Sequence, residues 1–313
     1  MTRLIVVRFS AALAMALALT VTLGTFENVV FLTERPLIRL PSRLRPWAVS
    51  TPDDVLIVDI NRPRQRAELA ALVQEIASGG ARAIGFTIVF AGAKDADGDS
   101  LFLSALDQAG TAVLGYVEPE VYPFPVRDGE KPTRIELGYL NLAYSSWFGF
   151  EGIEPRIVRN GKEHLSFPVA VALKLDSVRA RQATTYPKLH PNFYGPPATF
   201  KRIMMEDFRK YASLNQLNGK IVIVDSSSTS LMAVETAVGS MWVGEIHANL
   251  IANILYGGLL IFSRVANAVV GLIAATVILL GRWRSLAAAA VLLCAHWVVS
   301  ILCIVLFGLV TSL

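Results

Sequence analysis

Apolar residues are concentrated at the two ends of the chain. Residues 9–26 contain no charged side chain, and the apolar run extends from residue 4 to residue 32, interrupted only by Arg8 and Glu27. A stretch of this length can cross about 30 Å of hydrocarbon as a helix. A cleaved signal peptide is the alternative, but the run continues past Glu27, and this favours an uncleaved anchor. We therefore predict an N-terminal transmembrane anchor in residues 1–33.

The C-terminal apolar region is divided by a short basic turn. Residues 265–281 and 285–313 contain no Lys, Arg, Asp or Glu, and Arg282-Trp283-Arg284 lies between them. Each stretch is long enough to span a bilayer, so we predict two further transmembrane helices in residues 262–313. Arginines flank both sides of the predicted spans, but a short basic turn is typical of the cytoplasmic side. This places residues 34–261 and Leu313 outside the cytoplasm.

The central residues 34–261 alternate between two patterns. Continuous runs rich in Val and Ile are typical of strands buried on both faces, and the segments between them have apolar residues at helical spacing. We predict strands over residues 55–60, 83–90, 111–117 and 220–225, and helices over residues 65–77, 97–109, 167–175 and 245–256. Residues 138–143 are a weaker strand prediction, and 181–197 are predicted to be loop. The order predicts a three-layer α/β domain with a mainly parallel sheet.

Composition agrees with a membrane protein that carries a water-facing domain. Of the 313 residues, 53% are hydrophobic and 17% are charged, which is too apolar for a wholly soluble protein. The net charge of +4 gives no reason to expect nucleic acid binding. Both cysteines, Cys294 and Cys303, lie in the last apolar stretch, so the central domain has no disulfide. We expect a bacterial inner-membrane protein whose main domain is periplasmic.

Three groups of polar residues are candidates for a binding site. Asp59 and Asp225 each end a predicted central strand, and ligands of doubly wound sheets collect at that edge. A serine run begins at Ser226, and Glu245 and His247 lie near the start of the last central helix. Structural roles are the alternative for each group: the aspartates as caps, the serines as a solvated loop, and Glu245 as an anion favoured by the helix dipole.

Enzyme motifs are missing from the sequence. It has no Gly-x-x-x-x-Gly-Lys phosphate loop, no Gly-x-Ser-x-Gly nucleophile elbow and no His-Glu-x-x-His zinc motif. Glu245 and His247 are two residues apart, so on a helix they point to nearly opposite sides. We therefore predict a protein that is not an enzyme, with no metal site and no cofactor.

Six short segments, in this order, give the chain a family resemblance. They are VLIVDIN (55–61), GARAIGF (80–86) followed by Val89-Phe90, residues 99–106, FPVAVAL (167–173), GKIVIV (219–224) and EIHAN (245–249). In these segments the chain resembles the type-2 CHASE domain, CHASE2, over roughly residues 27–261. The resemblance implies an extracytoplasmic sensory domain with one span before it and further spans after it. It supports binding residues at Asp59, Asn61, Glu245 and His247.

The sequence also departs from the family pattern. The family usually has Asp where Thr87 stands, Gly where Asp225 stands and Pro where Ala237 stands, and its Gly-Val is here Val243-Gly244. The resemblance further implies a cytoplasmic kinase or nucleotide cyclase module after the last span, and these 313 residues contain none. We therefore expect that any effector is a separate protein.

Two functions follow as expectations. In the first, the outer domain binds a partner or ligand, and the chain acts with a separate effector or as an accessory subunit of a membrane or envelope complex. In the alternative, it is a stand-alone sensor of a small molecule that signals through its transmembrane helices to a kinase or nucleotide cyclase. The expected partners are the lipid bilayer and other membrane or periplasmic subunits, and a small-molecule ligand stays open.

Overall fold

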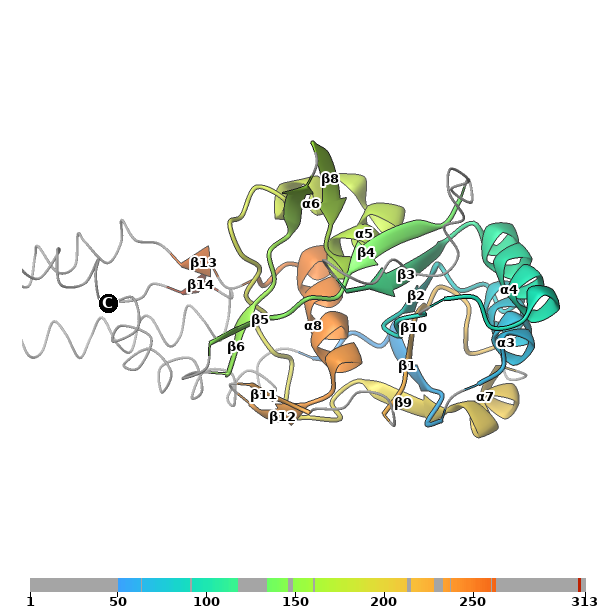
Figure 1. Ribbon diagram of the computed structural model, residues 1–313. Coiled ribbons are helices and arrows are strands. Elements are labelled where there is room, and N and C mark those ends of the chain that lie inside the picture. Colours follow the sequence, from blue (N-terminus) through green and yellow to red (C-terminus); the bar gives the residue numbers. More distant parts are fainter. Residues whose placement is uncertain are drawn as a thin grey trace, which may run out of the picture. The chain divides into compact units, whose positions relative to one another are not determined.

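A sheet of six parallel strands lies at the centre of residues 50–259 (Figure 1). The computed structural model describes residues 50–62, 64–90, 92–117, 134–145, 149–159, 161–212, 215–227, 233–236, 238–259, 261–262 and 309–310. The strand order is β4-β3-β2-β10-β1-β9, and every pair is parallel. The strands are β1 (Val55–Asp59), β2 (Ala83–Phe86), β3 (Ala112–Tyr116), β4 (Glu136–Tyr139), β9 (Lys201–Met204) and β10 (Ile221–Asp225). The four strands β1, β2, β3 and β10 are buried along their whole length, as their apolar runs predict.

Helices cover both faces of the sheet (Figure 1). On one face lie α3 (Arg66–Ser78), α4 (Ala96–Ala109) and α7 (Met205–Ala212). On the other face lie α5 (Phe167–Leu175), α6 (Ser177–Ala183) and α8 (Val243–Tyr256). The fold is therefore the predicted three-layer α/β arrangement.

The α3–α4 layer packs on the sheet through aromatic rings and one buried ion pair. Phe86, Phe90 and Phe102 contact one another, with ring centroids 5.1–5.6 Å apart. The Arg66 guanidinium lies 4.3 Å from the centroid of the Phe90 ring, and its Nε is 3.3 Å from Asp99 Oδ1. Both side chains of this ion pair are less than one-tenth exposed, so α3 and α4 are joined by a charge pair inside their own interface.

Short antiparallel pairs are added to this core. They are β5 (Ala143–Ser145) with β6 (Gly149–Gly152), β7 (Arg156–Arg159) with β8 (Lys162–Leu165), and β11 (Val234–Thr236) with β12 (Gly239–Met241). In the second unit of the chain, residues 1–49 and 260–313, the described strands are β13 (Ile261–Phe262) and β14 (Leu309–Val310), which pair in parallel.

The structure corrects several sequence predictions. The strand predicted over 83–90 ends at Phe86, the loop predicted from residue 181 begins only after α6 ends at Ala183, and β9 and α7 were not predicted. The helix prediction over 97–109 is confirmed by α4, whose Phe102 fills the core.

The predicted transmembrane helices fall almost wholly outside the described residues. Within the described part of the chain, none of the helices combines the length and the apolar character needed to cross a bilayer. Leu309–Val310, inside the third predicted span, is described and forms the extended strand β14 in place of the expected helix. The three spans otherwise stay predictions.

Candidate functional site

Two buried carboxylates lie side by side at the carboxyl edge of the sheet. Asp59 ends β1, Asp225 ends β10, and the register of these neighbouring strands places the two residues directly opposite each other. They are only 1% and 2% exposed. Burying two carboxylates together is costly unless each is neutralised or hydrogen-bonded. The structure thus brings together the two strand-end residues that the sequence singled out.

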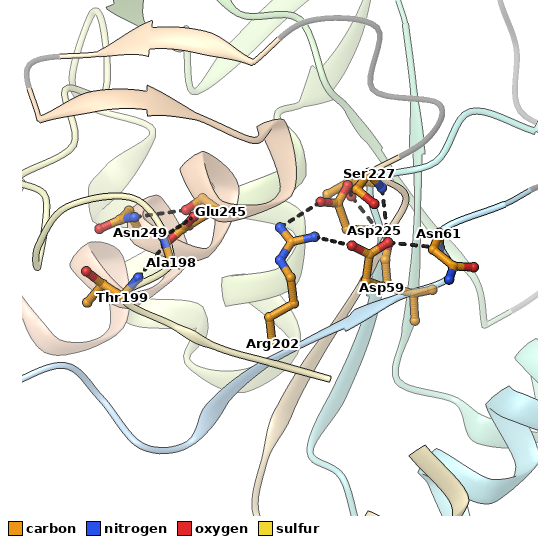
Figure 2. Close-up of polar contacts among 11 residues, drawn as sticks. Asp59, Asn61, Ala198, Thr199, Arg202, Asp225, Ser227, Glu245 and Asn249 are labelled. Carbon is orange, nitrogen blue, oxygen red and sulfur yellow. Dashed lines mark hydrogen bonds and ion pairs between the residues drawn. The ribbon is translucent and has the colours of Figure 1, made fainter. Parts of the chain in front are cut away.

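Arg202 of β9 compensates this pair (Figure 2). Its Nη1 lies 2.7 Å from Asp59 Oδ2, and its Nη2 lies 3.3 Å from Asp225 Oδ2. The planar guanidinium suits such a bridge, because it presents several N–H groups in a fixed geometry. Sequence analysis missed Arg202, since nothing near it in the chain indicates that its partners are 143 and 23 residues away.

The remaining oxygens of the pair are also occupied. Asp59 Oδ1 accepts hydrogen bonds from the main-chain nitrogens of Asn61 (2.9 Å) and Ser227 (3.0 Å). Asp225 Oδ1 accepts a hydrogen bond from the Thr87 hydroxyl at 2.8 Å. Burial raises the pKa of Asp59, but hydrogen bonds from Ser227, Asn61 and Arg202 outweigh this effect and bring its pKa below the usual value. The carboxylate is therefore held in its charged form.

The start of α8 lies against Asp225. A Cβ placed on Gly244 would be 2.4 Å from Asp225 Cγ, so only glycine fits here without a shift of the helix or of the aspartate. The positive end of a helix dipole favours a nearby anion. The N-terminus of α8 therefore adds to the stabilisation that Arg202 gives Asp225.

Glu245 fixes a neighbouring loop and does not reach the aspartate pair. Its Oε1 accepts a hydrogen bond from the main chain of Thr199 at 2.9 Å, and its Oε2 accepts one from Ala198 at 3.0 Å (Figure 2). Glu245 is 1% exposed. Through these bonds Glu245 holds the segment that leads into β9 and Arg202. As an acidic residue in the first turn of α8, it also agrees with the dipole alternative, and its ligand role stays a prediction.

His247 lies apart from the site. It is fully buried, and its ring packs edge-on against Phe167 of α5, with centroids 5.2 Å apart. Neither ring nitrogen makes a hydrogen bond of good geometry within the described residues. Desolvation lowers the pKa of His247 to about 3, although the backbone of Leu140 opposes the shift. His247 is thus a neutral core residue.

Asn61 and Ser226 border the aspartate pair. Asn61 has a left-handed backbone (φ 40°), a conformation that asparagine tolerates better than most residues, and this turn directs its N–H toward Asp59. Ser226 is buried at the end of β10. Of the serines that follow, only Ser227 belongs to the described residues, and it contacts Asp59 through its main chain.

The chemistry available at this edge is that of a closed ion-pair cluster. The two aspartates and Arg202 together carry one net negative charge. Within the described residues, His, Cys, Asp and Glu form no group of three that is placed to hold a metal ion. These charged contacts hold β1, β9, β10 and the start of α8 together.

A parallel α/β sheet with a polar cluster at its carboxyl edge defines a class of domains in which that edge is the usual place for ligands. The model of the CHASE2 domain family matches residues 10–295, so this chain belongs to the CHASE2 family. CHASE2 domains are extracytoplasmic sensory domains. Neither the curated proteins nor the solved structures include a match to the chain. The family match confirms the resemblance seen in the sequence. Two of the positions that depart from the family pattern contact each other, because the Thr87 hydroxyl donates a hydrogen bond to Asp225.

Proposed function

We propose that the chain is a membrane-anchored CHASE2 protein whose extracytoplasmic domain binds a partner protein. In this proposal residues 1–33 form an N-terminal anchor, residues 34–261 the outer α/β domain and residues 262–313 two further spans in the inner membrane. The chain acts with a separate effector or as an accessory subunit of a membrane or envelope complex, and it is not an enzyme.

One observation carries the preference for a partner protein over a small ligand. Each of the six oxygens of Asp59, Asp225 and Glu245 already accepts a hydrogen bond from the chain's own Arg202, Thr87 or main-chain N–H groups. Because these carboxylates are at most 2% exposed, a small molecule that reached them would have to disturb contacts that stabilise the fold. Breaking a buried pair by removing one partner costs about 3–5 kcal/mol. Partner recognition elsewhere on the domain surface has no such cost.

The alternative is a stand-alone sensor of a small anion. Arg202 is 18% exposed, whereas the aspartates beneath it are almost fully buried. Only two of the five N–H groups of an arginine are needed for the contacts to Asp59 and Asp225. An anionic group that approaches this edge from solvent therefore meets donors that are not used by the pair.

Purification of the full chain from its native membrane separates the two functions. For an accessory subunit, we expect one other protein in stoichiometric amount after extraction in mild detergent. Its retention by the Asp59→Asn variant would show that the aspartate pair is not needed for assembly. A lone chain whose melting temperature rises with a small anion in the wild type, but not in Asp59→Asn, would overturn the proposal.

The proposed topology has its own test. A reporter fused after Leu313 is expected to be active only on the outer side of the membrane, because three spans separate the two ends of the chain. A reporter fused before residue 1 is the matched control and is expected to be active only in the cytoplasm. Activity of the Leu313 fusion in the cytoplasm would contradict the three-span arrangement.

A further inference from the structure

The helix α8 extends from one edge of the sheet to the other. Its first turn lies against Asp225 at the carboxyl edge, where Gly244 permits the close approach. Its last residue, Tyr256, donates a hydrogen bond from its hydroxyl to Asp54, which directly precedes β1 at the amino edge. One rigid element therefore joins the carboxylate pair to the edge at which residues 50–259 begin and end.

A segment that we call the strap, residues 192–202, is held along α8 by a ladder of polar side chains. The ladder residues Glu245, Asn249 and Asn253 are spaced four apart and so lie on one face of the helix. Asn249 Oδ1 accepts from the main chain of Tyr194 at 3.1 Å. Asn253 accepts from the Asn192 nitrogen at 2.8 Å and donates to its oxygen at 3.1 Å.

The ladder supplies hydrogen-bond partners to residues 192–199 of the strap, which come before β9 and belong to no strand or helix. Buried main-chain N–H groups must be paired, because an unpaired one costs about 1–3 kcal/mol. The three ladder side chains are each at most 1% exposed. The position of the strap is therefore fixed by α8, from Asn192 to the Ala198 and Thr199 contacts with Glu245.

The strap returns to the start of the same helix. Three residues after Thr199, Arg202 pairs with Asp59 and Asp225, and Asp225 in turn lies against Gly244 of α8. Contacts thus run from Asp225 to Arg202 and along the strap to Glu245 (Figure 2). Glu245 directly follows Gly244 in α8, and Gly244 lies against Asp225.

We propose that Arg202, the strap and α8 form one cooperative unit that transmits the state of the Asp59–Asp225 pair to the amino edge of the domain. When Arg202 is withdrawn, two adjacent buried carboxylates repel each other, and their separation moves β10 against the start of α8. The strap moves with Arg202 and releases the ladder. The inference rests on the proposed function in one respect: the movement matters outside the domain because the chain continues from this edge toward its predicted spans.

Hydrogen–deuterium exchange on the full chain in mild detergent tests the coupling. Arg202→Met keeps the aliphatic stem and removes the charge, and the matched control is Arg209→Met, because Arg209 is an exposed arginine of α7 paired with Glu75. We expect Arg202→Met to speed exchange at least tenfold in peptides that cover the strap and α8, and Arg209→Met to leave both unchanged. Faster exchange confined to residues 59–61 and 225–227 would overturn the proposal.

A second variant disturbs the contact between α8 and the strap, and it provides a test if Arg202→Met does not fold. Glu245→Gln keeps the shape of the side chain and weakens its hold on the strap. Coupling between two sites is reciprocal, so we expect faster exchange at Ser227, whose N–H donates to Asp59, as well as in the strap. An effect limited to the strap would overturn the proposal. Neither measurement requires a bound partner, so failure to isolate a partner and failure of the coupling are separate results.

Discussion

The buried histidine of α8 makes the stability of the domain depend on pH. His247 is fully buried, and its pKa in the folded state is lowered to about 3 from an ordinary value of 6.5. In the unfolded chain His247 therefore binds a proton below about pH 6.5, whereas in the folded domain its side chain stays neutral down to about pH 3. Since the unfolded state binds more protons between these values, stability falls as the pH falls from 6.5 toward 3 and is fully present above 6.5.

The magnitude follows from the shift. Each pH unit below 6.5 costs about 1.4 kcal/mol, so at pH 5 the loss due to His247 is about 2 kcal/mol. For a domain of this size, about 2 kcal/mol corresponds to a fall in melting temperature of about 4–8 °C. His247→Phe replaces the ring by one that still packs against Phe167 and cannot be protonated. The variant should lack this part of the pH dependence.

The assay is thermal unfolding of the full chain in mild detergent, followed by tryptophan fluorescence at pH 7.5 and pH 5.0. We expect the difference between the two melting temperatures to be about 4–8 °C larger in the wild type than in His247→Phe. Equal pH dependence in the wild type and His247→Phe would refute the reasoning.

Three further substitutions test the packing and the charge cluster. Asp99→Asn removes the carboxylate that is paired with the buried Arg66 guanidinium and should lower the free energy of unfolding, measured by urea titration, by about 3–5 kcal/mol. Gly244→Ala places a Cβ against Asp225 and should lower it by about 1–3 kcal/mol, although alanine is the better helix former. The pKa of Asp59 is lowered, so the stabilisation that its carboxylate gives the fold is present above pH 3.8 and is lost as the pH falls further. In the His247→Phe background, Asp59→Asn should therefore reduce the fall in melting temperature below pH 4.

Each of these predictions has a control or a contrary outcome. Glu163→Gln removes one partner of the exposed pair with Arg156 and should cost less than about 1 kcal/mol, in contrast to Asp99→Asn. A Gly244→Ala variant as stable as the wild type would show that α8 and Asp225 have room to separate. An unchanged melting curve of Asp59→Asn below pH 4 would mean that the Asp59 carboxylate is not stabilised by its hydrogen bonds.

The elements that the sequence predicted correctly are those with a strong local signal. The strands β1 and β10 are continuous apolar runs that end in Asp, and α8 has apolar residues at helical spacing beside its polar face. The strand β9 (KRIM) and the helix α7 (MEDFRKYA) lack such a signal. Each is short and carries several charges, and tertiary pairing with β1 holds β9 in place.

The candidate site, too, could be predicted only where the local sequence carries a signal. Strand-end position identified Asp59 and Asp225, and their contact follows from the parallel pairing of β1 and β10. The bridge by Arg202 and the ladder on α8 depend on distant segments, and one sequence does not indicate which arginine meets which aspartate. The spacing of Glu245, Asn249 and Asn253 was visible as one polar face, and it could have indicated a segment bound along that face of the helix.

The position of β10 has a consequence for how the domain reaches its native state. This strand comes near the end of the domain sequence but lies between β1 and β2, which come near its beginning. The sheet is therefore incomplete, with two unpaired strand edges in its middle, until residue 225 has arrived. If the domain is exported as proposed, most of it crosses the membrane before it can fold, and long-range parallel pairing of this kind is slow. We expect the newly translocated chain to depend on a holding chaperone until β10 is inserted.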